Sequence, residues 1–345
     1  MRQPKVSLAW LLVAVTLALP ALSAGWTVCV TTAFLGEFLS DGSFPLLSAL
    51  TPYPVREPLL TGATAADVYR PLALRSPAGL VLIHGLAPEG KDDPRLSQAA
   101  RLLARAGFRV AVPTIPGLTR LRLRPEDSEA VVAAIRSLAG EDRSRKVSVL
   151  GVSVGAGPAL LAAADPRVAD RVGTVLSLGG YASTVELLRY FLTGAYGYGG
   201  AAGRVAPQPE AARLFLRQNL DLLENAEDRR RLDGWLAAPG LPPPSGLFPQ
   251  GAAVLSLVEN RDPARVDALV RALPPGLQNL LVRLSPEQEI SRVSARLFLV
   301  HGRRDPAVPG VRHGGREGRG GRRGDGLDDG ERERGAPLHD VEAAI

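Results

Sequence analysis

The residues best placed to do chemistry are Gly151-Val152-Ser153-Val154-Gly155. Glycines at this spacing allow a serine to sit on a sharp turn between a strand and a helix, where its hydroxyl can attack a carbonyl carbon. Three fixed positions recur by chance, so the context decides. An apolar strand is expected over 146–152 and a helix over 155–164. We therefore predict a nucleophilic Ser153; the alternative is a glycine-rich turn with an incidental serine.

The elements around this motif alternate between short apolar runs and helical patterns. Glycine or proline closes most of them, as at Gly107 after the helix expected over 96–106. Alternation of this kind predicts parallel βαβ units, with a sheet covered by helices on both faces. The expected strands are 64–69, 79–85, 108–112, 146–152, 172–178 and 295–300, and the other expected helix is 125–138.

The alternation breaks between about 185 and 291, where helical patterns are separated by stretches rich in Gly and Pro. We interpret this segment as a helical insertion, a lid that would shape an apolar acyl pocket. The expected organisation is a signal or anchor over 1–36, a linker over 37–62, the α/β domain with its insertion over 63–309, and an atypical tail over 310–345.

On these residues the chain resembles the α/β-hydrolase superfamily, and within it bacterial dienelactone-hydrolase-like and related esterase proteins. The resemblance covers roughly 63–185 and 293–309. It implies an α/β-hydrolase fold, a mostly parallel sheet with helices on both faces. To this fold the patterning of the chain adds a helical lid insertion, an N-terminal membrane segment and an irregular C-terminal tail. His84-Gly85-Leu86 matches the family's strand end, which implies an oxyanion hole made by the backbone N–H groups of Leu86 and Val154. His84 itself is expected to be structural.

The resemblance also implies a triad in the order Ser153, Asp305, His339. Asp305 stands in a strand-to-loop stretch like the one that presents the acid; its alternative role is that of a turn aspartate. His301 is expected to be structural like His84, and His313 follows Asp305 too closely for a helix and a strand to intervene. The charged loop 87–93 either contacts substrate or is simply solvated.

His339 is a provisional choice of base because residues 311–335 depart from the family. They comprise nine Gly, seven Arg, six Asp or Glu, and only Val311, His313 and Leu327 besides. Such a composition offers no apolar helix face and no buried strand, so we expect this stretch to lack the last helix and strand of the sheet. Its abrupt onset after Pro309 is what a shifted reading frame would produce.

The N-terminus carries Arg2 and Lys5, followed by 31 uncharged residues over 6–36. The run is long enough for a bilayer span of about 20 residues, although Pro20 would kink it. An uncleaved anchor and a cleaved signal with its site at Ala21-Leu22-Ser23 both place the domain on the non-cytoplasmic side, with membrane contact through 6–35 for the anchor. The third alternative is a buried core helix.

Composition excludes several other classes. The net charge of +6 is spread along the chain, which argues against nucleic-acid binding, and a single cysteine, Cys29, excludes an intramolecular disulfide and a cysteine-rich metal site. No cofactor is expected.

The function predicted from the sequence is that of a membrane-anchored or secreted serine hydrolase acting on esters, thioesters or lactones. The alternatives are a non-catalytic binding protein on the same fold and an acyltransferase.

Overall fold

The computed structural model describes residues 25–62, 64–72, 78–140, 144–198 and 201–301. Asp305, His313, His339 and the tail expected over 310–345 lie outside the described residues. The chain divides into two compact units, of which the second, 51–312, contains the α/β sheet. Each unit is considered by itself.

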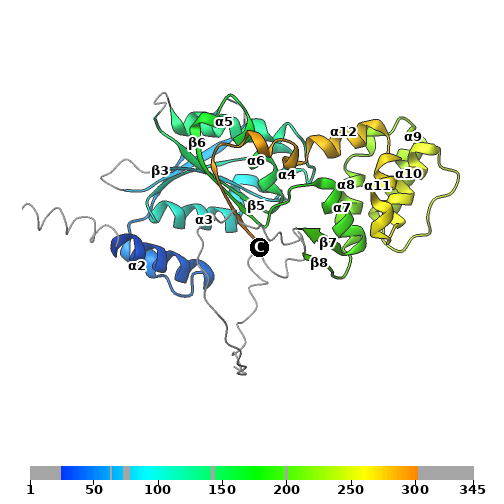
Figure 1. Ribbon diagram of the computed structural model, residues 1–345. Coiled ribbons are helices and arrows are strands. Elements are labelled where there is room, and N and C mark those ends of the chain that lie inside the picture. The colour runs from blue at the N-terminus through cyan, green and yellow to red at the C-terminus, as the bar shows by residue number, and fades with distance from the viewer. Residues whose placement is uncertain (1–24, 63, 73–77, 141–143, 199–200, 302–345) are drawn as a thin grey trace, which may run out of the picture. The chain divides into compact units, whose positions relative to one another are not determined.

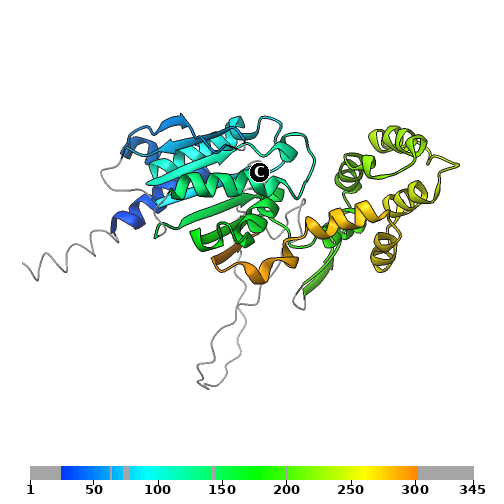
Figure 2. The same ribbon diagram turned by 90° about the horizontal axis from the view of Figure 1, so that it is seen from above.

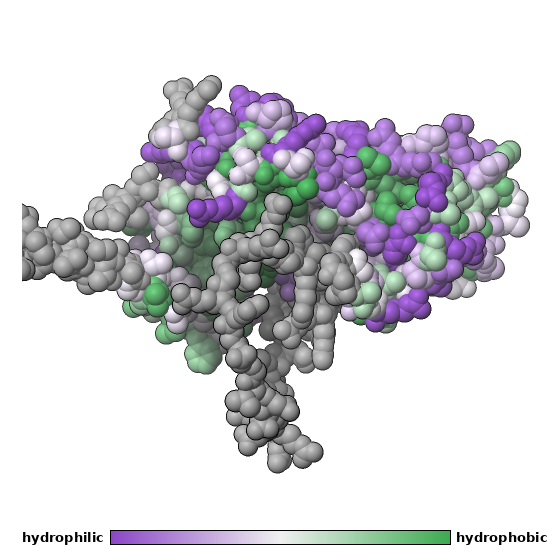
Figure 3. Space-filling view, viewed as in Figure 1, coloured by the Kyte–Doolittle hydropathy of each residue, from purple (hydrophilic) through white to green (hydrophobic). Residues whose placement is uncertain are grey.

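The first unit is described over residues 25–50. It holds a helix over 25–39 and the short α2 (Leu46–Leu50), and Glu37 Oε2 accepts a hydrogen bond from Ser48 N at 2.8 Å between them. Many of its side chains are both apolar and exposed, and Figure 3 shows hydrophobic surface over it: Trp26, Val28, Leu35, Phe38, Leu39, Phe44, Leu46 and Leu50. Within the described part of the chain, no helix combines the length and apolar character needed to cross a bilayer. Most of the predicted membrane segment lies outside that part.

The second unit is built on a seven-stranded sheet of order β1-β2-β4-β3-β5-β6-β9, parallel from β4 to β9 and antiparallel at β1 and β2. Its strands are β1 (Val55–Pro58), β2 (Ala66–Arg70), β3 (Ala78–Ile83), β4 (Phe108–Pro113), β5 (Val147–Val152), β6 (Val172–Leu178) and β9 (Arg296–Val300). This arrangement confirms the predicted mostly parallel sheet. Where the sequence indicates a linker over 37–62, the structure has α2 and β1, and β1 pairs with β2.

Helices cover both faces of this sheet, α5 and α6 on one and α3 on the other (Figure 1). The alternation along β3 explains why: Val81 and Ile83 enter the core that includes α5 and α6, while Leu80 and Leu82 enter the core that includes α3. The helices of this layer are η1 (Gly90–Asp92), α3 (Pro94–Arg105), α4 (Pro116–Thr119), α5 (Asp127–Ala139), η2 (Ser153–Gly155), α6 (Ala156–Ala164) and η3 (Ala169–Arg171).

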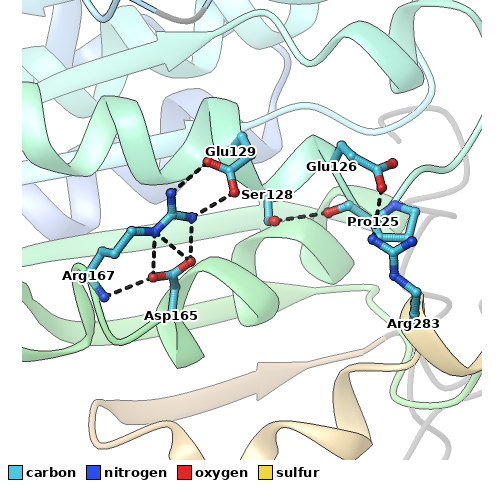
Figure 4. Close-up of polar contacts among 7 residues, drawn as sticks. All are labelled: Pro125, Glu126, Ser128, Glu129, Asp165, Arg167 and Arg283. Carbon is cyan, nitrogen blue, oxygen red and sulfur yellow. Dashed lines mark hydrogen bonds and ion pairs between the residues drawn. The ribbon is translucent and has the colours of Figure 1, made fainter.

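Ion pairs fasten α5 to its neighbours (Figure 4). Glu129 and Asp165 both bind Arg167, with N–O distances of 2.7 and 2.6 Å, and Glu126 binds Arg283 at 2.8 Å. The guanidinium of Arg167 holds the pKa of Asp165 below its ordinary value. Arg283 belongs to the insertion, so the second pair joins the insertion to the sheet layer.

The insertion occupies the region between β6 and β9 and extends to one side of the sheet layer (Figure 2). The prediction of helices is confirmed for most of it, but the segment also contains a two-stranded antiparallel hairpin that the sequence analysis did not foresee. Alanine and glycine dominate that hairpin, and neither favours strands. The elements are α7 (Thr184–Thr193), β7 (Ala195–Tyr198), β8 (Ala201–Arg204), α8 (Pro209–Arg217), η4 (Leu220–Leu222), α9 (Ala226–Ala237), α10 (Pro249–Glu259), η5 (Pro263–Arg265), α11 (Val266–Arg271), α12 (Pro275–Arg283), η6 (Pro286–Gln288) and η7 (Ile290–Arg292).

Candidate active site

Ser153 lies at the turn between β5 and α6, with its backbone in the left-handed region at φ = +52°. Residues other than glycine rarely adopt this conformation, which costs about 1–2 kcal/mol. It persists only where the surroundings enforce it, and such positions cluster at active sites. The side chain is half-buried, and none of the described residues forms a hydrogen bond with Ser153 Oγ. The hydroxyl is therefore held at a strained turn with no hydrogen-bond partner among the residues that the structure describes.

The flanking glycines are required by close backbone contacts. A Cβ on Gly155 would lie 2.2 Å from His84 O, and one on Gly151 would lie 2.6 Å from Ala156 Cα. Both distances are shorter than real Cβ contacts. The motif spacing therefore has a direct steric cause: the turn packs against the end of β3 and against the start of its own helix.

The end of β3 lies beside Ser153. Ile83 pairs with Gly151 in the parallel register of β3 and β5, and a Cβ on Gly85 would lie 3.3 Å from Ser153 Cβ. Leu86 follows in the same loop. The N–H of Val154 belongs to the first turn of the helical segment, where backbone donors have no intrahelical acceptor. The two expected oxyanion-hole residues thus flank the nucleophile.

His84 uses both ring nitrogens on the backbone. Nε2 accepts a hydrogen bond from Ile115 N at 3.0 Å, so the proton resides on Nδ1, which donates to Gly85 O at 2.7 Å. Burial lowers the pKa of His84, and a neutral ring is what an Nε2 that accepts a hydrogen bond requires. It holds the β3 and β4 loops together, as the sequence analysis anticipates for a strand-end residue. His301 directly follows β9 and is half-buried.

The charged loop 87–93 is largely engaged in the scaffold. Lys91 Nζ lies 3.0 Å from both Asp67 Oδ2 and Asp92 Oδ2, and Lys91, together with Arg56, lowers the pKa of Asp92. Asp93 caps α3 by accepting hydrogen bonds from Arg95 N and Leu96 N. Lys91, Asp92 and Asp93 thus bind other residues of the scaffold, a role that differs from both alternatives expected for this loop.

An apolar cavity of about 90 Å³ opens beside Ser153. Leu86 and Val154 contribute to its wall from the sheet layer, and the insertion supplies most of the other lining residues. The side chains that line the cavity are apolar except for Thr184, whose hydroxyl is hydrogen-bonded to Ser285 Oγ. The other lining residues are Leu121, Leu123, Leu187, Leu188, Phe191, Ala211, Leu214, Phe215 and Leu281. An apolar pocket at the insertion was predicted from the sequence, but of its lining residues only Leu86 and Val154 were named, and those as oxyanion-hole donors.

Two buried groups near the site have no counterpart among the predicted residues. Asp127 Oδ1 and Oδ2 accept hydrogen bonds from Gly117 N and Arg124 N at 2.8 and 3.0 Å, and burial raises the pKa of this carboxyl. Tyr181 packs against the nucleophile helix at Gly157, and burial raises the pKa of its hydroxyl. Acidic residues are common at helix starts, so the sequence did not indicate that Asp127 would bind the backbone of the loop before α5.

Residues 80–335 match the profile of the alpha/beta hydrolase family, and the chain belongs to that family. A search of curated proteins gave no match. Among solved structures, the chain is similar to a dienelactone hydrolase from Anabaena variabilis, with 22% identity, 37% of this chain and 65% of that chain covered, and a TM-score of 0.31.

It is also similar to lipase A from Candida antarctica in its closed state, with 17% identity, 74% of this chain and 65% of that chain covered, and a TM-score of 0.45. A bacterial membrane phospholipase A matches with 16% identity, 87% and 84% coverage and a TM-score of 0.38. The chain spans about 60–65% of the length of the dienelactone hydrolases that it matches. None of these likenesses bears on substrate.

Proposed function

We propose that the protein is a serine hydrolase that cleaves carboxylic esters, thioesters or lactones through an acyl-enzyme intermediate. The observation that carries the proposal is the left-handed backbone of Ser153, next to Val154, which lines an apolar cavity together with Leu86. A strained serine that is bonded to none of the described residues and lies next to backbone donors supports acyl transfer.

The proposed reaction has two halves. Ser153 Oγ adds to the substrate carbonyl while its proton passes to the base, and the N–H groups of Leu86 and Val154 stabilise the oxyanion. The alcohol or thiol then leaves with that proton, and water releases the acyl group by the same route. His84 is bound to the backbone through both nitrogens, which argues against it as the base. We assign the base to His339, oriented by Asp305.

The cavity volume bounds the acyl group. An apolar cavity of about 150 Å³ is enough to bind benzene, and the cavity beside Ser153 is smaller, at about 90 Å³. We therefore expect acyl groups of a few carbons to be preferred, with the insertion acting as a lid over them.

The test is labelling with a fluorophosphonate probe and hydrolysis of p-nitrophenyl butyrate. Wild-type protein should label and turn over, and Ser153→Ala should lose labelling and about 10⁴–10⁶-fold in turnover. Ser256→Ala is the matched control, since Ser256 is exposed on α10 and its hydroxyl bonds to Ala252 O of the same helix. Wild-type protein that neither labels nor turns over would instead indicate a non-catalytic binding protein. Butyryl transfer to an added alcohol in preference to water would indicate an acyltransferase.

We also propose that residues 6–35 anchor the protein in a membrane, with the catalytic domain on the non-cytoplasmic side. The uncharged run after Arg2 and Lys5 and the exposed apolar residues of the helix over 25–39 support this. Alkaline phosphatase fused after Leu60 should be active in a bacterial host. An inactive fusion with the full-length protein in the soluble cytoplasmic fraction would contradict the proposal.

A further inference from the structure

One wall of the apolar cavity is a strained loop. Between α4 and α5 the chain passes through Leu121, whose φ of +56° places a branched residue in the left-handed region. Leu121 and Leu123 both line the cavity, and Arg122 stands between them. A backbone of this kind is kept only where neighbouring contacts over-determine it. The contacts of Arg122 are the first candidates for that role.

Arg122 reaches from this loop to the insertion. Its Nε donates to Asn219 Oδ1 at 3.0 Å, and its Nη2 donates to Asp221 at 2.8 and 2.9 Å. Asn219 is 1% exposed, so the amide contact is shielded from water, whereas the Asp221 side chain is 60% exposed. The ion pair is therefore screened by solvent and the amide contact is not.

Asn219 passes the connection on to a second part of the cavity wall, in the insertion. Its Nδ2 donates to Phe215 O at 2.7 Å, near the C-terminal end of α8. Phe215 lines the cavity together with Ala211 and Leu214 of the same helix. A continuous hydrogen-bonded path thus runs from the loop that carries Leu121 to the helix that carries Phe215.

We infer that Arg122 sets the width of the cavity, and with it the length of acyl group accepted, by tying these two walls together through Asn219. The inference rests on the proposed hydrolase function for its acyl substrate. Arg122 is a positioning residue, because its charged end binds Asn219 and Asp221 and it is not itself among the cavity-lining residues. Without it, the loop and α8 can separate, and longer chains fit between them.

A second ion pair between the insertion and the sheet layer provides a matched control. Arg283 on α12 binds Glu126 at 2.8 Å (Figure 4), with side chains that are 54% and 59% exposed and no lining role. It resembles the Arg122–Asp221 pair in chemistry but lacks the buried amide contact. Arg283→Ala therefore removes an arginine that joins the insertion to the sheet layer without touching the path through Asn219.

The experiment compares kcat/KM for p-nitrophenyl octanoate and butyrate in Arg122→Ala, Arg122→Lys, Asp221→Ala and Arg283→Ala. We expect the octanoate-to-butyrate ratio to rise about tenfold in Arg122→Ala, the size of discrimination that one methylene commonly supplies. Arg122→Lys, which keeps a charge for Asp221 but has no guanidinium, should move the ratio in the same direction. Asp221→Ala and Arg283→Ala should stay within about twofold of wild type, and thermal melts establish that each variant is folded.

Binding of the fluorescent fatty acid 11-(dansylamino)undecanoic acid to the Ser153→Ala background provides a readout without turnover. Arg122→Ala should bind it about tenfold more tightly than its parent, and Arg283→Ala should match the parent. A folded Arg122→Ala or Arg122→Lys protein with unchanged selectivity and binding would overturn the inference, and so would an Asp221→Ala protein that reproduces the Arg122→Ala shift. If wild-type protein lacks esterase activity, the proposed function fails, and the binding measurements still decide the role of Arg122.

Discussion

Replacing Gly155 by alanine tests the packing of the nucleophile turn against β3. The added Cβ would lie 2.2 Å from His84 O, 3.0 Å from His84 C and 3.1 Å from Ile83 Cγ2. Real Cβ contacts are essentially never shorter than 3.0 Å, so one of the two backbones must retreat by at least 0.8 Å. His84 is fixed by its own hydrogen bond to Ile115, which leaves the nucleophile turn to move.

Two effects should follow in Gly155→Ala. Overpacking at a site of this kind destabilises a protein by about 1–3 kcal/mol. A displacement near 1 Å between the nucleophile and the oxyanion donors should cost about 100-fold in kcat. KM should change less, because the acyl cavity is built largely from other elements. Urea unfolding and p-nitrophenyl butyrate hydrolysis measure the two effects.

Gly234→Ala is the matched control. Gly234 lies within α9, and nothing stands within 4 Å of a Cβ added there. Alanine favours a helix interior over glycine, so this variant should gain about 0.5–1 kcal/mol and keep wild-type turnover. A Gly155→Ala protein with unchanged turnover and an unchanged urea midpoint would refute the steric reasoning.

Two further substitutions address the buried polar groups. Burial lowers the pKa of His84 below 6.5, so the unfolded chain binds the extra proton first and stability should fall as pH drops below about 6.5. His84→Gln removes that contribution, and the slope of stability against pH should flatten by up to about 1.4 kcal/mol per pH unit; an unchanged slope contradicts the neutral assignment. Asp127→Asn leaves one of two N–H groups, the buried one of Gly117 or the partly buried one of Arg124, without an oxygen acceptor, and should cost about 1–3 kcal/mol in urea unfolding. Wild-type stability in that variant would show that the carboxylate does not anchor the loop.

Much of the sheet layer could be predicted because its elements carry local signals. The strand predicted over 172–178 coincides with β6. Gly107, predicted to end the helix over 96–106, follows α3 with φ = +104°. β1 could not be predicted in the same way, because Val55–Pro58 is short and largely exposed and its identity depends on pairing with β2. The hairpin β7–β8 was not predicted because its strands are short and rich in Ala and Gly, so that they too depend on pairing with each other.

In the candidate site, too, the local features could be predicted from the sequence and the long-range contacts could not. The turn at Ser153 could be predicted because the residue types that it requires, Gly151, Ser153 and Gly155, fall within five consecutive positions, although the contact that requires Gly155 comes from His84. An apolar pocket was predicted, but its lining residues were not, since they come from segments far apart in sequence, and Arg122 meets Asn219 across 97 positions. Spacing rules describe neighbours along one element, so they do not reach contacts of this range. The predictions for Asp305 and His339 remain predictions.

The left-handed backbone at Ser153 has a consequence for how such a protein changes under selection. A glycine there would relieve the strain of about 1–2 kcal/mol while abolishing the nucleophile. Selection for abundance or heat resistance alone would therefore favour loss of the serine, and only selection on turnover would retain it. In a library screened for thermal tolerance without an activity filter, inactive Ser153→Gly clones should be enriched.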